Sequence, residues 1–532
     1  MKPTLNPSPK EGLAKTPKVL PFGKDLGWAA LLLTAATPVA AQTAPKPNIL
    51  YIMCDDMGYG DLGCYGQPYI STPHIDQMAR EGMRFTQAYA GSPVSAPSRA
   101  TLMTGQHSGH TWVRGNREYW PGHLTVRYGD NADYAVVGQE PYDTAHVILP
   151  EVLKRNGYTT ALFGKWAGGY EGSISTPRTR GIDEFYGYIC QFQAHAYYPN
   201  FLNRYSPSQG DDDVVRIVLH DNIRHGMPCT DTYRQRTQYS ADLIHQAAMQ
   251  WLDERALHPE QPFAGILTYT LPHAELAQPD DSILHTYRRQ FEAEQPFGGN
   301  PTSWYHPTDC PHSQFAAMIT RLDTYVGEIL AFLRDHGLDR NTLVVFTSDN
   351  GPHEEGGADP TFFGRDGQLR GIKRSTYEGG IRIPYIVWWP GHVAAGTVSD
   401  HQLAFYDVLP TLCDLIGDDR FPTGYVNPRL DGDGFDGISF APTLLGHGEE
   451  QAHHPHLYWE FHETDMLGVR MDDWKLVVSH GRCHLYDLAT DLHEDHDVAD
   501  RHPDIVRRMT DIIRTEHTPS TLFHVTLPTT AQ

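Results

Sequence analysis

Acidic residues stand directly after two apolar segments of the chain. Asp55 and Asp56 follow the segment NILYIMC, and Asp349 and Asn350 follow TLVVFT after one serine. Adjacent carboxylates repel each other in a confined site unless a cation is present. Three carboxylates and one amide oxygen form an all-oxygen ligand set, which suits Ca²⁺ or Mg²⁺ and not zinc. We therefore predict a site for a hard divalent cation; the structural alternative is a pair of turn residues after a strand.

A serine with the position of a nucleophile begins the segment SAPSRATLMTG at Ser95. Pro97 suits the first turn of a helix, and the apolar residues from Ala100 to Met103 continue it. Ser95 then lies at a helix N-terminus, where unpaired N–H groups favour a developing anion. A serine at a helix start is usually only a cap, so this position alone does not establish catalysis.

The whole pattern Ser-x-Pro-Ser-Arg followed by Leu-x-x-Gly resembles the signature of the sulfatase family, the formylglycine-dependent type I branch of the alkaline-phosphatase-like superfamily. In that family an activating enzyme oxidises the first residue, Cys or Ser, to formylglycine, and the hydrated aldehyde is the nucleophile. The serine at position 95 resembles the bacterial branch of the family. The resemblance therefore implies an anaerobic-type sulfatase-maturating enzyme, a radical-SAM protein, as a partner.

Other blocks of the family match in order over nearly the whole chain after Pro45. They are Asp55–Gly58, Ser348–Gly351, Tyr377–Pro384 and Leu485–Leu488 with Glu494. The first two match the metal-binding pairs. The resemblance implies that Ca²⁺ or Mg²⁺ is held by Asp55, Asp56, Asp349 and Asn350, with residue 95 as a further ligand.

The resemblance also assigns roles around the nucleophile. Lys165 and Lys373 match the lysines that bind sulfate, and Arg99 is expected to orient residue 95 with its rigid guanidinium. His273 matches the histidine near the leaving oxygen, which makes it a candidate general acid because a departing alkoxide needs a proton.

One position departs from the family pattern. Many members read Gly-Lys-Trp-His from the position of Gly164 onward, and this chain has Ala167 in place of the histidine. That histidine often assists the second half of the family's reaction. His353 and His107 are the candidates to compensate for its absence, and a rebuilt neighbourhood is the alternative.

Two segments carry candidates for substrate contact. Residues 187–199, which include His195, Tyr197 and Tyr198, resemble a segment in sulfatases of carbohydrate-degrading bacteria. Arg114, Asn116 and His353 are further candidates. An imidazole and aromatic faces suit the hydroxyls and the apolar CH surface of a sugar, and a structural role is the alternative for each residue. We expect sulfated galactose or N-acetylgalactosamine from a host or algal glycan as the substrate.

The pattern of apolar residues predicts the strands and helices that must position these residues. Four runs predict buried strands: Asn48–Cys54, Thr159–Phe163, Phe263–Thr270 and Thr342–Thr347. Helical spacing predicts helices over Thr72–Glu81, His146–Asn156, Tyr239–Glu254 and Ser313–His336. The alternation predicts an α/β fold with a large, mainly parallel sheet flanked by helices. The resemblance to sulfatases implies that this is the alkaline-phosphatase-like fold. Ligands of such sheets bind beyond the carboxyl ends of the strands, so the four strands predict one shared site.

The pattern changes after about residue 420. Short alternating segments between His456 and Asp487 predict a small antiparallel sheet, and Pro503–His517 predicts an amphipathic terminal helix. We predict a signal peptide at residues 1–41, a catalytic domain at 45–430 and a C-terminal α+β subdomain at 431–532.

The bulk composition limits the partners. The formal net charge is −23 with histidine neutral, which makes nucleic acid an unfavourable partner. A polyanionic substrate would need a local basic pocket, because the overall negative charge of the protein repels it. Seven cysteines without CxxC spacing predict mostly buried thiols with at most one or two disulfides.

The N-terminal segment has the pattern of an export signal. Residues 27–41, GWAALLLTAATPVAA, form a short apolar run that ends in small residues and follows Lys18 and Lys24. A membrane anchor is the alternative, but the run is short for a span and contains Pro38. We expect a periplasmic or secreted protein without stable membrane insertion.

Two other functions remain open from the sequence. A phosphatase or phosphodiesterase of the same superfold would use unmodified Ser95, although such enzymes usually have a two-zinc site that is not evident here. A non-catalytic glycan-binding protein on a sulfatase scaffold is the other alternative, with Ala167 as its only support.

Overall fold

The computed structural model describes residues 46–119, 138–199, 201–219, 237–299, 305, 307–364, 369–418 and 434–528. The predicted signal peptide, residues 1–41, lies outside this part of the chain. So does most of the Gly- and Asp-rich loop that precedes Gly437.

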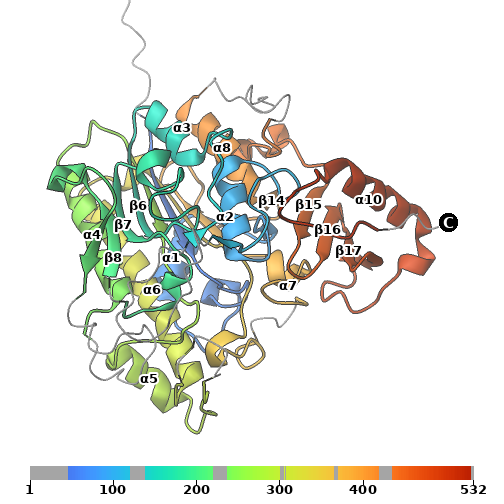
Figure 1. Ribbon diagram of the computed structural model, residues 1–532, viewed down its shortest axis with the longest axis horizontal. Coiled ribbons are helices and arrows are strands. Elements are labelled where there is room, and N and C mark those ends of the chain that lie inside the picture. Colours follow the sequence, from blue (N-terminus) through green and yellow to red (C-terminus); the bar gives the residue numbers. More distant parts are fainter. Residues whose placement is uncertain are drawn as a thin grey trace, which may run out of the picture. The chain divides into compact units, whose positions relative to one another are not determined.

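A ten-stranded sheet organises the larger part of the protein (Figure 1). Its strands are β1 (Asn48–Cys54), β2 (Met83–Phe85), β6 (Thr159–Lys165), β7 (Glu184–Tyr188), β8 (Phe201–Tyr205), β9 (Val215–Val218), β10 (Phe263–Thr268), β11 (Thr342–Ser348), β12 (Tyr385–Trp388) and β13 (Thr397–Ser399). They lie in the order β13-β2-β12-β11-β1-β10-β6-β7-β8-β9. The five from β11 to β7 run parallel, whereas β12 and β8 are antiparallel to their inner neighbours.

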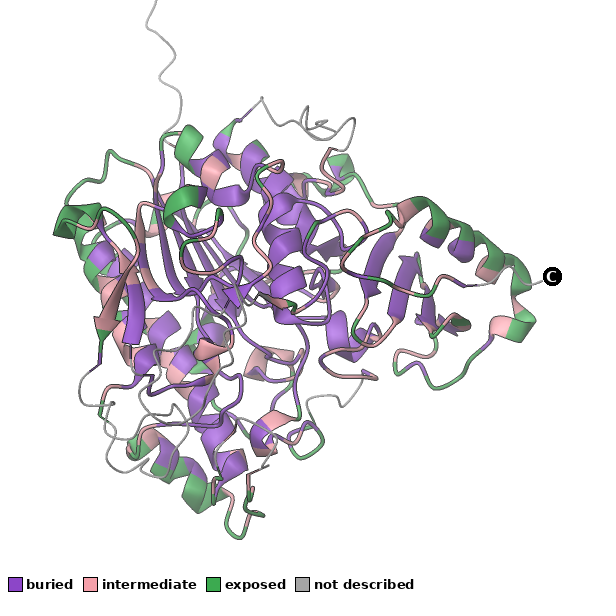
Figure 2. Ribbon diagram, viewed as in Figure 1, coloured by how far each residue is buried: buried purple, intermediate pink, exposed green. Residues whose placement is uncertain are grey.

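The apolar runs form central strands because both faces of the sheet are covered. In β1, Leu50 and Ile52 pack into one core cluster, while Ile49 and Tyr51 pack into the other. Successive side chains of a strand point to opposite faces, so a strand buried on both sides must be apolar at every position. Figure 2 shows this sheet as buried along its central strands.

Helices cover the two faces. Side chains of α1 (Pro73–Glu81), α4 (Ser240–Ala256) and α6 (Pro311–Asp335) belong to one core cluster. Those of α2 (Ser95–Thr104), α3 (Leu149–Arg155) and α8 (Val408–Ile416) belong to the other. A further helix, α5 (Ser282–Gln290), packs against α6.

The four predicted strands are confirmed, and they are direct neighbours in the order β11-β1-β10-β6. Because all four run parallel, their carboxyl ends meet at one edge of the sheet. The predicted helices are confirmed as α1, α3, α4 and α6, with ends that differ by at most three residues. Sequence reasoning missed the other strands of this sheet, β2, β7, β8, β9, β12 and β13, because three to five residues are too short for a periodic signal.

A second, antiparallel sheet lies toward the C-terminus (Figure 1). It contains β15 (Leu457–Phe461), β16 (Met466–Met471), β17 (Trp474–Ser479) and β18 (Arg482–Asp487) in sequence order. The helix α10 (Pro503–Glu516) packs on it through Met509 and Ile513. This confirms the small C-terminal sheet; the boundary at residues 430 and 431 stays a prediction, because residues 419–433 are not described.

Two smaller findings concern the helices and the cysteines. No helix in the described part of the chain is long and apolar enough to cross a bilayer. No disulfide joins the six cysteines in the described ranges to one another, and Cys229 lies outside these ranges.

Candidate active site

Ser95 lies at the N-terminus of α2, at the carboxyl edge of the large sheet. Val94 is extended and the helix begins at Ser95, with Pro97 in its first turn as predicted. The Ser95 hydroxyl donates a hydrogen bond to Oδ1 of Asp55 at 2.8 Å and accepts one from Nζ of Lys165 at 3.1 Å. The oxygen at position 95 therefore lies between a carboxylate and an ammonium group.

The two acidic pairs meet because β1 and β11 are parallel neighbours. The amide of Asp56 donates to Oδ1 of Asp349 at 3.1 Å, and Nδ2 of Asn350 donates to Oδ1 of Asp56 at 2.7 Å. Asp55, Asp56, Asp349 and Asn350 are all buried. Asp56 also has a φ of 62°, a left-handed conformation that is uncommon outside glycine and often found at functional sites.

Each of the three carboxylates contacts a cationic side chain. Lys165 pairs with Asp55, the Nζ of Lys373 lies 2.8 Å from Asp56, and the Nη2 of Arg99 lies 2.8 Å from Asp349. For Asp55 and Asp56 these contacts outweigh the burial that opposes ionisation.

Burial raises the pKa of Asp55, but Lys165, His273 and Arg99 hold it well below its usual range. Burial likewise opposes the ionisation of Asp56, and Lys373 lowers its pKa. For Asp349, burial and the charge of Asp55 prevail and raise the pKa to about 6. The negative charge of Asp349 is thus incompletely compensated by the cationic side chains of the protein.

The donor set fits a hard divalent cation. The side-chain oxygen of Asn350 is buried and accepts no hydrogen bond from any described residue. An unsatisfied amide oxygen among three carboxylates is the arrangement that Ca²⁺ or Mg²⁺ satisfies. The residues that would hold the ion are Asp55, Asp56, Asp349 and Asn350, together with residue 95.

His273 follows β10 and stands over this acidic group. Its Nε2 lies 3.2 Å from Oδ2 of Asp56 and 3.0 Å from Nζ of Lys373, while its Nδ1 contacts the carbonyl of Ala274. Burial and the charge of Lys373 lower the pKa of His273. The ring of His195 stacks on that of His273 with centroids 4.4 Å apart.

A cavity of about 590 Å³ opens over these residues. Ser95, Lys165, His273 and Lys373 line it. Its other lining residues are Asn116, Arg117, Glu118, Gln191, Phe192, His195, Tyr305, Glu355, Arg374, His462, Glu463 and Leu522. Of the predicted substrate contacts, His195 and Asn116 thus lie at the cavity.

The structure does not place Arg114, His353, Tyr197 or Tyr198 among the residues that line the cavity. Arg114 is buried, with Nη1 donating to Glu460 at 2.8 Å and to the carbonyl of Thr518. It ties the loop after α2 to the C-terminal part. His353 is fully buried behind His273, its Nε2 lies near the carbonyl of Pro272, and its Nδ1 accepts the amide hydrogen of Glu355.

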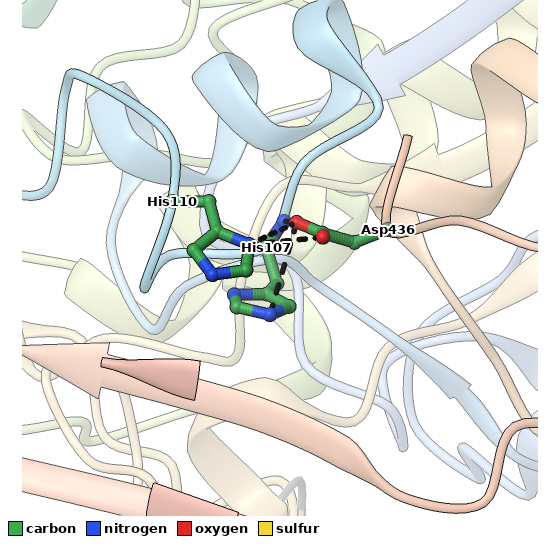
Figure 3. Close-up of side chains that lie close together, drawn as sticks. All are labelled: His107, His110 and Asp436. Carbon is green, nitrogen blue, oxygen red and sulfur yellow. Dashed lines mark hydrogen bonds and ion pairs between the residues drawn. The ribbon is translucent and has the colours of Figure 1, made fainter. Parts of the chain in front are cut away.

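His107 does not compensate for Ala167. It follows the C-terminal end of α2, about 15 Å along the helix axis from Ser95 at 1.5 Å per residue. Figure 3 shows its ring beside that of His110, with Asp436 next to both. Its Nδ1 accepts the amide hydrogen of Gly109, so in the neutral ring Nε2 carries the proton, 3.1 Å from Glu516 on α10. The hydrogen bonds of this cluster connect segments that are far apart in the chain.

Ala167 itself is buried in a left-handed conformation with a φ of 54°, and it does not line the cavity. Its amide donates to the carbonyl of Ile189.

Sequence reasoning missed Glu355. Its Oε2 accepts hydrogen bonds from Lys373 at 3.1 Å and from the hydroxyl of Tyr305 at 3.0 Å, and its Oε1 accepts one from Arg374 at 2.6 Å. The neighbouring cations hold the pKa of Glu355 far below its usual range against burial. The only sequence signal for it is its position a few residues after Asp349 and Asn350.

Comparison with known proteins gives one consistent result. A family model described as Sulfatase matches residues 47–418, and one described as N-sulphoglucosamine sulphohydrolase, C-terminal, matches residues 372–517. The N-acetylgalactosamine-6-sulfatase of Canis lupus familiaris is 33% identical over 441 residues, which cover 80% of this chain and 71% of that protein. The N-acetylgalactosamine-6-O-sulfatase of Bacteroides thetaiotaomicron is 28% identical, with 90% and 94% covered.

Among solved structures, that of Ps i-CgsB in complex with k-i-k-neocarrahexaose superimposes with a TM-score of 0.66. It is 26% identical and covers 90% of this chain and 95% of its own.

Proposed function

The chain belongs to the sulfatase family and is a sulfuric ester hydrolase, and we propose that it cleaves a sulfate ester of a carbohydrate with a nucleophile made from Ser95. One observation carries the choice of nucleophile. The Ser95 oxygen lies at the N-terminus of α2 between Asp55 and Lys165, in a cavity that Lys373 and His273 also line.

Two groups complete this site in the proposal: a formylglycine at position 95 and a Ca²⁺ or Mg²⁺ ion on the acidic residues. The first would supply an oxygen nucleophile at position 95, and the second would withdraw charge from the sulfate oxygens. The buried, unsatisfied oxygen of Asn350 and the crowding of Asp349 with Asp55 support the cation.

Lys165 and Lys373 would then bind the sulfate oxygens. In the chain alone, Lys165 and Lys373 pair with Asp55 and Asp56. A divalent cation would compensate these carboxylates, so each ammonium could donate its hydrogens to sulfate oxygens instead. The Nη2 of Arg99 lies 2.8 Å from Oδ2 of Asp349 and 3.5 Å from Oδ2 of Asp55, so this guanidinium keeps the two carboxylates together.

His273 is placed to hold the proton for the leaving oxygen. Its Nδ1 faces the carbonyl of Ala274, so Nε2 is the atom that faces Lys373 and Asp56 at the cavity. The lowered pKa of His273 makes its protonated form a stronger acid toward the departing alkoxide.

We propose sulfated galactose or N-acetylgalactosamine as the sugar. Relatives that align with most of this chain include N-acetylgalactosamine-6-sulfatases, and a solved structure with the same fold contains a neocarrahexaose. The Nδ1 of His195 has no hydrogen-bond partner in the described part of the chain, and its ring lies at the cavity on top of His273. That nitrogen is itself buried, so a sugar in the cavity would contact the remaining surface of the His195 ring.

The direct test is a hydrolysis screen of the matured protein. Substrates are galactose and N-acetylgalactosamine sulfated at defined positions, glycosaminoglycan disaccharides, an aryl sulfate and the matching aryl phosphate. We expect sulfate release from at least one sugar and little phosphate release. Faster hydrolysis of the phosphate ester would instead favour a phosphatase that uses unmodified Ser95.

We further propose export to the periplasm or beyond, and maturation by an anaerobic-type sulfatase-maturating enzyme. The apolar run at residues 27–41 and the serine at position 95 support these two points. Cell fractionation of the full chain and of a variant lacking residues 1–41 tests export, because only the full chain should leave the cytoplasm.

A further inference from the structure

Arg374 is an unexplained cation at the cavity. It follows Lys373 directly, lines the same cavity as Ser95, and has a side chain that is 42% exposed. Neither the nucleophile, the metal ligands nor the general acid requires it. The scissile sulfate already has two lysines.

The backbone of Arg374 is held in an unfavourable conformation. Its φ is 73°, in the left-handed region that costs a non-glycine residue free energy. Two contacts hold it there: its amide donates to the carbonyl of Pro93 at 2.8 Å, and its carbonyl accepts a hydrogen bond from Thr464 at 2.9 Å. The surrounding structure therefore determines the direction of this side chain.

The guanidinium is anchored on one nitrogen only. Its Nη1 donates to Oε1 of Glu355 at 2.6 Å, while the other carboxylate oxygen of Glu355 accepts from Lys373. Glu355 thus holds the two cations beside each other. The Nε and Nη2 of Arg374 have no acceptor among the described residues, and these two nitrogens form the edge that binds two oxygens of an anion.

We propose that Arg374 binds a second anionic group of the substrate, a sulfate or a uronate carboxylate carried on the same or the adjacent sugar as the scissile sulfate. This inference rests on the proposed function. A chain with a net charge of −23 repels a polyanionic glycan unless local cations receive each of its charges. Arg374 supplies such a charge beside the lysines that take the scissile group.

The experiment measures binding in the Ser95→Ala background, so that turnover does not enter. Ligands are N-acetylgalactosamine with one sulfate, the same sugar with two sulfates, and a disaccharide of the monosulfated sugar with a uronic acid. Calorimetry compares the Ser95→Ala protein with its Arg374→Gly derivative, because glycine retains the left-handed backbone without the guanidinium. The control is Arg178→Gly, which removes an arginine with the same 42% exposure outside the residues that line the cavity.

We expect Arg374→Gly to lower the affinity for at least one doubly anionic ligand about 10- to 100-fold, which is the range for loss of a charged hydrogen bond. The affinity for the singly sulfated sugar should fall less than about twofold. The doubly anionic ligand that is affected identifies the group as sulfate or carboxylate. Equal weakening of all three ligands, or no weakening, would overturn the proposal. Sulfate release by the unsubstituted enzyme reports separately on the proposed function.

Discussion

Lys475 and Glu378 form an ion pair with no exposed surface, with 2.7 Å between Nζ and Oε1. Lys475 lies on β17 of the C-terminal sheet, and Glu378 begins α7 (Glu378–Ile381), five residues after Lys373. The small sheet is therefore bonded directly to the segment that carries a predicted sulfate-binding lysine. Lys475, Arg470 and Arg382 hold the pKa of Glu378 at about 2 against burial.

Removing Lys475 should destabilise the protein strongly. Lys475→Met leaves the Glu378 carboxylate buried without its nearest cation, and loss of one partner of a buried pair costs about 3–5 kcal/mol. Urea unfolding followed by circular dichroism measures this cost. The matched control is Lys154→Met, whose partly exposed pair with Asp183 should contribute less than about 1 kcal/mol. Similar costs for both variants would contradict the assignment.

Glu494 should make stability depend on pH in a defined window. Burial raises its pKa from the usual 4.5 to about 8, because the nearby charge of Lys475 does not outweigh desolvation. A carboxyl with a raised folded-state pKa contributes stability that is complete below pH 4.5 and is lost as the pH rises through about 8. Relative to Glu494→Gln, the unsubstituted protein should lose unfolding free energy across this window. Parallel curves of unfolding free energy against pH would refute this role of Glu494.

Replacement of Ser95 should abolish turnover without unfolding the protein. Ser95→Ala removes the group from which the nucleophile is made, so we expect kcat to fall on the order of 10⁴-fold or more. Peptide mass spectrometry of the active protein should show residue 95 lighter by two hydrogen atoms. Ser92→Ala is the control, because Ser92 is also buried before α2 and its hydroxyl has no described hydrogen-bond partner. Full activity in Ser95→Ala would exclude the proposed mechanism.

Chelation should remove both activity and thermal stability, and calcium should restore them. A ligand present at 100 times its Kd stabilises the folded state by about 2.7 kcal/mol, which raises Tm. Asn350→Ala removes the unsatisfied buried oxygen and should abolish the response of Tm to calcium. Stoichiometric zinc in the purified protein, without calcium or magnesium, would contradict the oxygen-ligand site.

Truncation of His195 should distinguish sugar recognition from chemistry. His195→Ala removes an imidazole that lines the cavity, so it should lower kcat/KM on the true sugar sulfate about 5- to 100-fold. The rate on a small aryl sulfate should change much less, because that substrate has no hydroxyl to bind. Equal losses on both substrates would assign His195 to positioning of its stacked neighbour His273.

The sequence by itself determined the central sheet and the meeting of the two acidic pairs at its edge. Strands covered on both faces must be apolar throughout, so β1, β6, β10 and β11 are visible as continuous runs. The acidic pairs follow β1 and β11 directly, and adjacent parallel strands bring their carboxyl ends together. Local pattern therefore sufficed for Asp55, Asp56, Asp349 and Asn350.

Only the tertiary structure decided which flanking side chains reach the cavity. Arg114 pairs with Glu460, 346 residues away in the chain, and does not line the cavity. His107 lies at the far end of the helix that Ser95 begins, whereas Glu355 and Arg374 come to the cavity through contacts with each other and with Lys373. Such positions depend on packing between distant segments, and no spacing within the chain encodes them.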